Sequence, residues 1–94
     1  MGKLPVVQRA EYIMYLEYAN DLFWLHTDVW KWTSEVKKDY VRNLDRLQDL
    51  LNVPIYGLVD NEKLGKFGET IGFTFLQFVK GNDGNVYKVY SRSL

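Results

Sequence analysis

The sequence predicts an α+β fold with a mixed five-stranded sheet, in the order strand, strand, helix, strand, helix, strand, strand. Three observations predict it. Segments rich in aromatic and β-branched residues lie in both halves of the chain. Between them, one stretch has the apolar spacing of a long amphipathic helix. Near the C-terminus, a cluster of Gly, Asn and Asp separates two further apolar runs, which is typical of a β-hairpin.

The first two strands are predicted at residues 10–18 and 22–32, where aromatic side chains are frequent. Residues 1–8 contain Pro5 and are expected to be a loose lead-in. Residues 19–21 are Ala, Asn and Asp, which suit a turn, so the two strands are expected to form an antiparallel hairpin. A helix is the competing assignment for residues 10–18.

A long helix is predicted next, because Thr33 and Ser34 form a good N-cap pair. Asn52 ends this helix, and Pro54 prevents its continuation. Apolar residues recur at spacings of three and four, which places them on one side of the helix: Val36, Tyr40, Leu44, Leu47 and Leu51.

The segment after this helix predicts a buried strand and a short helix. Residues 55–59 are almost all apolar, as expected for a buried parallel strand. Asp60 or Asn61 is predicted to cap the second helix, and Gly72 to close it. The side chains of this helix expected to point inward are Leu64, Phe67 and Ile71.

The last two strands are predicted at residues 73–80 and 86–92. Residues 81–85 read Gly-Asn-Asp-Gly-Asn, which is a strong hairpin signal. The whole of residues 1–94 is therefore expected to fold as a single domain, in agreement with its length.

The composition excludes several classes of protein. Twelve basic and twelve acidic residues give a net charge of zero with no basic face, so a nucleic-acid partner is not expected. The absence of cysteine excludes disulfides, thiol catalysis and Cys-ligated zinc. No run approaches the ~18 apolar residues of a membrane span, and the start of the chain lacks a signal-peptide pattern. We therefore expect no membrane association and a cytoplasmic location.

The run PIYGLVDNEKLGKFGETIGF, residues 54–73, resembles the second half of a GNAT-type acetyltransferase domain. In that family a strand precedes Asn and Lys near the start of a short helix, followed by an aromatic residue and by a Gly-Phe that opens the next strand. Five residues match this order: Asn61, Lys63, Phe67, Gly72 and Phe73. The closing DGNVYKVYSR also looks like the family's last strand. The resemblance covers roughly residues 22–92 and is shared by small GNAT-like proteins of tailed phages.

This resemblance implies N-acetyl transfer from acetyl-CoA, but the residues depart from the family at the coenzyme site. GNAT enzymes bind the pyrophosphate with backbone amides of a glycine-rich loop that leads into the long helix. Residues 28–35 contain no glycine, two tryptophans and the carboxylate of Glu35. The family's first strand and two acceptor-binding helices have no room before residue 22, and residues 61–72 lack the tyrosine that often serves as the acid. We therefore expect no cofactor.

Two residues are candidates for catalysis, His26 and Glu17. His26 is the only histidine and could act as a general base beside Asp28, two residues along the same strand. Glu17 could act as a base from the sheet edge. Both also have an ordinary interpretation as solvated strand residues. No ligand spacing for a metal site stands out.

Three tryptophans are the candidates for binding a partner. Alternation along residues 22–32 places Trp24, Trp30 and Trp32 on one face of the strand. Aromatic side chains dominate the energetics of many interfaces. The alternative is that these rings form a core beneath the long helix.

These features predict a non-catalytic GNAT-like protein that binds a protein partner or a second copy of itself, through its tryptophan-bearing strands and an exposed sheet edge. In a phage setting, the partner would be a host factor or another phage protein in the host cytoplasm. The alternative is a minimal acetyl-CoA-dependent N-acetyltransferase.

Overall fold

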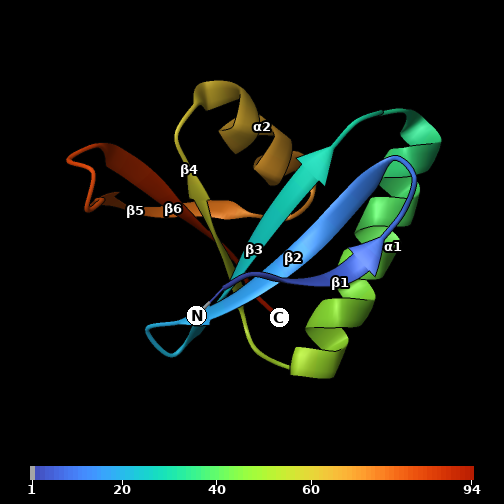
Figure 1. The fold of residues 1–94 in the computed structure, drawn as a ribbon, viewed down its shortest axis with the longest axis horizontal. Coiled ribbons are helices and arrows are strands. Elements are labelled where there is room, and N and C mark those ends of the chain that lie inside the picture. The colour runs from blue at the N-terminus through green and yellow to red at the C-terminus, as the bar shows by residue number, and fades with distance from the viewer. Residues whose placement is uncertain (1) are drawn as a thin grey trace.

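The protein is an α+β structure in which two helices cover a six-stranded mixed sheet (Figure 1). The computed structural model describes residues 2–94. In chain order the elements are β1 (Leu4–Gln8), β2 (Tyr12–Ala19), β3 (Leu22–Val29), α1 (Ser34–Leu51), β4 (Ile55–Val59), α2 (Glu62–Thr70), β5 (Thr74–Lys80) and β6 (Val86–Arg92). The strand order across the sheet is β1-β2-β3-β4-β6-β5, and only β3 and β4 are parallel.

The α+β class and the mixed sheet are confirmed, but the expected number of five strands is wrong. The sixth strand is β1, within residues expected to be a loose lead-in; Met1 lies outside the described residues. β1 pairs antiparallel with β2, placing Leu4 opposite Leu16 and Val7 opposite Met14. Pro5 did not prevent this, because an edge strand needs no hydrogen bonds on its outer side.

The hairpin of β2 and β3 is confirmed, and the helical alternative for residues 10–18 is wrong. Asn20 and Asp21 both have positive φ values, 54° and 63°, which is the geometry of a two-residue hairpin turn. β3 ends at Val29 and not at residue 32. The backbone N–H groups of Trp30 and Lys31 both donate to the carbonyl of Glu11, at 2.8 and 3.3 Å, so the regular one-to-one pairing of the hairpin stops there.

Both helices begin and end close to the predicted residues. Thr33 caps α1 by accepting from the backbone N–H of Val36, and Asn52 closes it in the left-handed conformation. Asn61 caps α2 in the same way. Leu64, predicted to point inward, is exposed, because α2 approaches the sheet through Gly65: a Cβ there would lie 2.7 Å from the Tyr90 hydroxyl.

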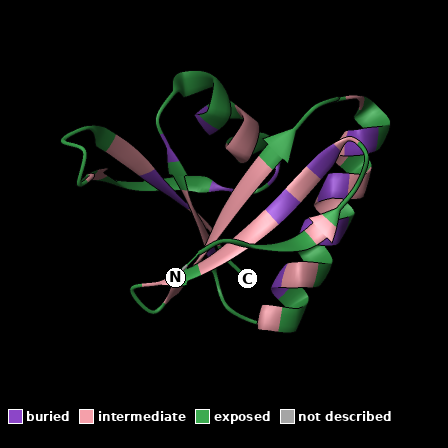
Figure 2. Ribbon diagram, in the orientation of Figure 1, coloured by how far each residue is buried: buried purple, intermediate pink, exposed green. Residues whose placement is uncertain are grey.

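The two helices lie on the same face of the sheet. The rings of Tyr40 on α1 and Phe67 on α2 pack edge to face with their centroids 5.9 Å apart. One continuous core joins them to the strands; its fully buried members are Tyr12, Met14, Tyr40, Leu44 and Ile55. Figure 2 shows buried positions on β2, β4, β6 and both helices, whereas most of β5 is exposed.

The opposite face of the sheet carries no helix within residues 2–94. Neither helix of the described chain is long and apolar enough to cross a membrane. The sheet therefore has one face that forms the core and one face that is open.

Candidate functional site

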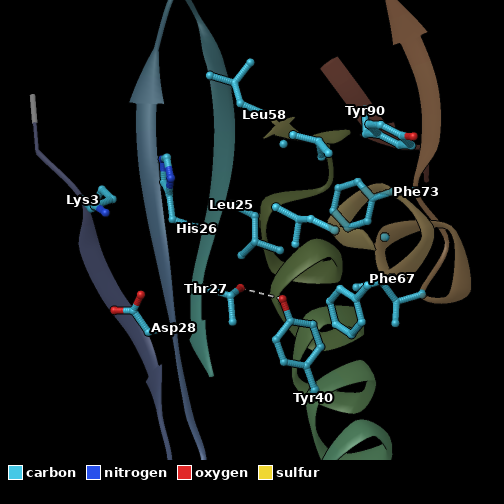
Figure 3. A pocket seen from close by; sticks show the side chains of 15 residues that line it. Lys3, Leu25, His26, Thr27, Asp28, Tyr40, Leu58, Phe67, Phe73 and Tyr90 are labelled. Carbon is cyan, nitrogen blue, oxygen red and sulfur yellow. Dashed lines mark hydrogen bonds between the residues drawn. The ribbon is translucent and has the colours of Figure 1, made fainter. Parts of the chain in front are cut away.

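A cleft lies inside the sheet, where β3 and β4 separate. The two strands pair only at Phe23 with Ile55 and at Trp24 with Tyr56. Beyond these positions β3 continues to Val29 and β4 to Val59 without further pairing. A cleft of about 250 Å³ opens between the two diverging strands (Figure 3).

The floor of the cleft is aromatic and comes from the two helices and from the segment that follows α2. Tyr40 is buried, and its hydroxyl is hydrogen-bonded to Thr27 Oγ1 of β3 at 2.7 Å. Burial raises the pKa of Tyr40 to about 12, so its phenol is neutral at physiological pH. Phe67 and Phe73 extend the apolar surface toward β4 (Figure 3). The cleft thus offers apolar walls with one neutral polar pair.

Gly57 keeps the β4 side of the cleft open. A Cβ built on this residue would find its nearest neighbour, a ring carbon of Phe73, at 4.0 Å. The position therefore has space for a side chain, and glycine leaves that space free. A glycine inside a strand often marks a place where another chain or a ligand approaches closely.

The rim on the open face of the sheet is polar. His26 Nε2 lies 2.9 Å from Glu17 Oε1, and the Tyr15 hydroxyl donates to Asp28 at 3.0 Å. The ammonium group of Lys3 stands 5.4 Å from the Tyr15 ring. Figure 3 shows Lys3, His26 and Asp28 on one side of the strands and Leu25, Thr27 and Tyr40 on the other. The cleft is therefore lined from both faces of the sheet.

The two residues predicted as catalytic candidates are brought together. His26 and Glu17 form a hydrogen-bonded pair at the rim, with each side chain about one-third exposed. Asp28, the neighbour of His26 two residues along the same strand, does not orient it and instead accepts the hydrogen bond from Tyr15. The two-residue turn sets this arrangement: it places Tyr15 opposite His26, which leaves Glu17 as the diagonal neighbour of His26.

The three tryptophans do not share one strand face, contrary to the prediction. Trp24 packs on Tyr56 at the closed end of the cleft and donates to the Ala19 carbonyl at 3.0 Å. Trp30 and Trp32 lie beyond the end of β3. Trp32 packs on Tyr40 and Phe67, with ring centroids 5.7 and 4.9 Å away.

Trp30 is 64 % exposed and is the most accessible tryptophan. Partner binding by these residues stays a prediction, but the three indoles cannot act as a single surface. Trp24 and Trp32 serve two different parts of the cleft, one at its closed end and one beside its floor.

The start of α1 does not form an anion cradle. The backbone N–H of Val36 already donates to Thr33 Oγ1 at 3.1 Å. Glu35 places a carboxylate in the first turn, where it accepts a hydrogen bond from Ser34 Oγ at 3.2 Å. The negative charge of Glu35 opposes the binding of an anionic ligand at the start of the helix.

Sequence reasoning missed Thr27, Tyr40 and Gly57 as cleft residues. Tyr40 was identified only as part of the apolar side of the helix, and Thr27 only as a strand residue. Gly57 carried a usable signal, since a glycine within a short apolar strand is unusual. Among residues 2–94, no group of three or more His, Cys, Asp or Glu side chains could hold a metal ion.

Comparisons with protein-family models, with curated proteins and with solved structures found no match to this protein.

Proposed function

We propose that this chain is a non-catalytic interaction protein that binds an extended segment of a protein partner in the cleft between β3 and β4. The observation that carries the proposal is the separation of two parallel strands inside an otherwise paired sheet. A GNAT-like origin of the scaffold belongs to the same proposal, as does a host or phage protein as the partner. It is supported by the element order from β3 onward: strand, helix, strand, helix, hairpin.

The unpaired backbone groups along the facing sides of β3 and β4 favour an extended ligand. β3 has its partner β2 on one side, and β4 has β6, but their facing sides are unpaired beyond Trp24 and Tyr56. Backbone N–H and C=O groups need hydrogen-bond partners. A peptide in the extended conformation supplies both kinds of group at the spacing of a strand, which is the basis of β-strand addition.

The shape and chemistry of the cleft suit a narrow chain. Its volume of about 250 Å³ lies below the range of roughly 300–1,000 Å³ typical of pockets for drug-sized ligands. Its walls include Leu25 and Phe73 for apolar side chains, and the Tyr40 hydroxyl for a polar group. The open face of the sheet gives a partner access to the rim.

The residues at the start of α1 do not fit the diphosphate of a coenzyme. The cap by Thr33 and the carboxylate of Glu35 occupy the place where the GNAT family uses free amides. No glycine lies between Asp28 and Glu35 to allow close approach of a phosphate to the backbone. We therefore derive no reaction that depends on acetyl-CoA.

A minimal N-acetyltransferase remains the second candidate, because one observation favours it. The hydrogen-bonded pair of His26 and Glu17 lies at the rim of the cleft and resembles a general base with its orienting carboxylate. This pair is also a common arrangement on a solvated strand surface.

The test is a selection from a library of random peptides displayed on particles. The wild-type protein is the bait, and the variant Gly57→Val serves for counter-selection, because its side chain occupies the cleft. Selected peptides are then labelled, and their affinity is measured by fluorescence polarisation. Thr74→Val, an exposed strand position outside the cleft, is the matched control.

The proposal expects peptides that bind the wild type and Thr74→Val equally, and Gly57→Val at least ten-fold more weakly, about 1.4 kcal/mol. Peptides that bind Gly57→Val as well as the wild type would refute the cleft as the site. Titration with acetyl-CoA tests the second candidate: saturable binding to the wild type, lost in Gly57→Val, would replace the proposed function by the enzymatic one.

A further inference from the structure

The two edges of the sheet differ in their readiness to pair with another strand. At one edge, β1 has five residues, contains Pro5 and is irregular between Pro5 and Val7. Proline and bulges are features that protect an edge from further pairing. At the other edge, β5 has seven residues, and its only charged residue is Lys80.

Exposed apolar side chains are concentrated on β5. Phe75, Leu76 and Phe78 are 45 %, 53 % and 62 % exposed. Phe75 packs on Phe78 with ring centroids 5.1 Å apart, and on Tyr90 of the neighbouring strand at 5.9 Å. The three rings form a row that starts at the buried Tyr90 on β6 and continues along the edge strand β5 through Phe75 to Phe78.

We infer that β5 pairs antiparallel with the β5 strand of a second copy of this chain, across a two-fold axis at Phe78. An axis perpendicular to the sheet keeps the helix-covered faces of both copies on the same side. Phe78 then faces Phe78 of the second copy, and Gln77 faces Val79. The aromatic row of each copy continues into the row of the other.

The strand is self-complementary in this register. Directly opposed aromatic residues stabilise antiparallel strands. In this register the two Lys80 side chains lie at opposite ends of the paired segment, whereas a parallel, in-register arrangement would place them opposite each other. The net charge of zero means that the two copies do not repel each other at long range.

The regular part of β5 limits the strength of this interface. A register shift between Phe75 and Gln77 bends the strand, so the straight ladder runs from Gln77 to Lys80. Interfaces this small belong to the class of weak, transient associations. We therefore expect a dimer whose population depends on protein concentration. This inference does not depend on the proposed function, because it concerns the edge strand β5 and not the cleft between β3 and β4. It can also be measured without any ligand.

The first experiment measures the oligomeric state by sedimentation equilibrium over a range of protein concentrations. The wild type should show a monomer–dimer equilibrium. Phe78→Lys places two ammonium groups across the axis and should weaken dimerisation at least ten-fold. The matched control is Leu50→Lys, which makes the same kind of change at an 84 % exposed position on α1 and should leave the equilibrium unchanged. A wild type that stays monomeric, or a Phe78→Lys variant that dimerises normally, would overturn the inference.

The second experiment tests the register, using the absence of native cysteine. Opposed residues of an antiparallel pair have Cα atoms about 4.5–5.5 Å apart, within the range of a disulfide. Phe78→Cys should therefore form a covalent dimer on oxidation at least ten-fold faster than Lys80→Cys, whose two copies would be about 14 Å apart.

An independent pair of variants keeps the phenylalanine in place. A mixture of Gln77→Cys and Val79→Cys should cross-link faster than either variant alone, because the inferred register places these two positions opposite each other. Equal rates in all samples would show random collision and would refute the register.

Discussion

Replacing Tyr40 by Phe should lower the stability of the protein at neutral pH and raise it in alkaline solution. At neutral pH the variant loses the 2.7 Å hydrogen bond to Thr27. A net hydrogen bond contributes about 0.5–1.5 kcal/mol, and the open cleft lets water reach Thr27, so a loss of about 1 kcal/mol is expected. Removing both partners in the double variant Thr27→Val, Tyr40→Phe should recover most of this loss.

The alkaline effect follows from the pKa of Tyr40, which burial raises from 10.0 to about 12 in the folded protein. The neutral phenol is favoured in the fold, so its contribution to stability is fully present below the unfolded pKa. It is lost as the pH rises through the folded pKa, because the unfolded chain ionises first. Linkage gives a loss of about 1.4 kcal/mol at pH 11 and about 2.3 kcal/mol at pH 12.

Phenylalanine cannot ionise, so the variant escapes this loss. The two stability curves should therefore cross near pH 11, with the wild type more stable below and Tyr40→Phe more stable above. Urea unfolding followed by tryptophan fluorescence measures both curves, since Trp32 lies 5.7 Å from the Tyr40 ring. The pKa values of Tyr15 and Tyr87 are also raised, but they affect both proteins alike. Parallel curves without a crossing would refute the assignment of Tyr40 as a buried, titrating phenol.

Three further substitutions test the packing around the site. Gly65→Ala should destabilise the protein by about 1 kcal/mol. A Cβ 2.7 Å from the Tyr90 hydroxyl costs about 1–3 kcal/mol, which outweighs the gain in helix propensity of about 1 kcal/mol. In a Tyr90→Phe background most of the loss should disappear. Gly72→Val should cost more than about 1 kcal/mol, since φ is 100° there and a Cβ would lie 3.0 Å from Arg92 Nε; thermal unfolding that matches the wild type would contradict this. Gln48→Ala should cost about 2 kcal/mol in urea unfolding, because the buried amide donates to the Arg92 carbonyl at 2.6 Å; a loss below about 0.5 kcal/mol would show that water replaces it.

The elements set by local chemistry were predictable from the sequence. The capping residues Thr33 and Asn61, and the left-handed Asn52 and Gly72, act within a few residues of their own position, so each can be recognised from side-chain type alone. The strand at residues 55–59 was recognisable for the same reason, as a short apolar run bounded by turn residues.

The features that depend on distant residues were not predictable. β1 is held by its pairing with β2, and its five residues carry no strong pattern of their own. Trp32 was assigned to the wrong face because alternation was extended past Val29, where β3 ends and the N–H groups of Trp30 and Lys31 share the carbonyl of Glu11. The pairing of His26 with Glu17 runs between two strands and depends on the exact length of the turn, whereas alternation along a single strand identifies only Asp28 as a neighbour of His26.

The cleft results from two opposing effects, strand pairing and side-chain packing, whose balance could not be predicted from the sequence. Closing β3 onto β4 would add main-chain hydrogen bonds to the sheet, so an open cleft needs something that opposes closure. The rings of Tyr40 and Phe67 provide it, because they come from both helices and pack against each other beneath the gap. Gly57 contributes nothing to this support, and it lowers the intrinsic preference of β4 for a strand. If the cleft were only a packing irregularity, Gly57→Val would make the protein more stable by up to about 1 kcal/mol and change nothing else. If the cleft binds a partner, the same variant stays folded and loses the interaction, so stability and binding measured on one protein separate the two explanations.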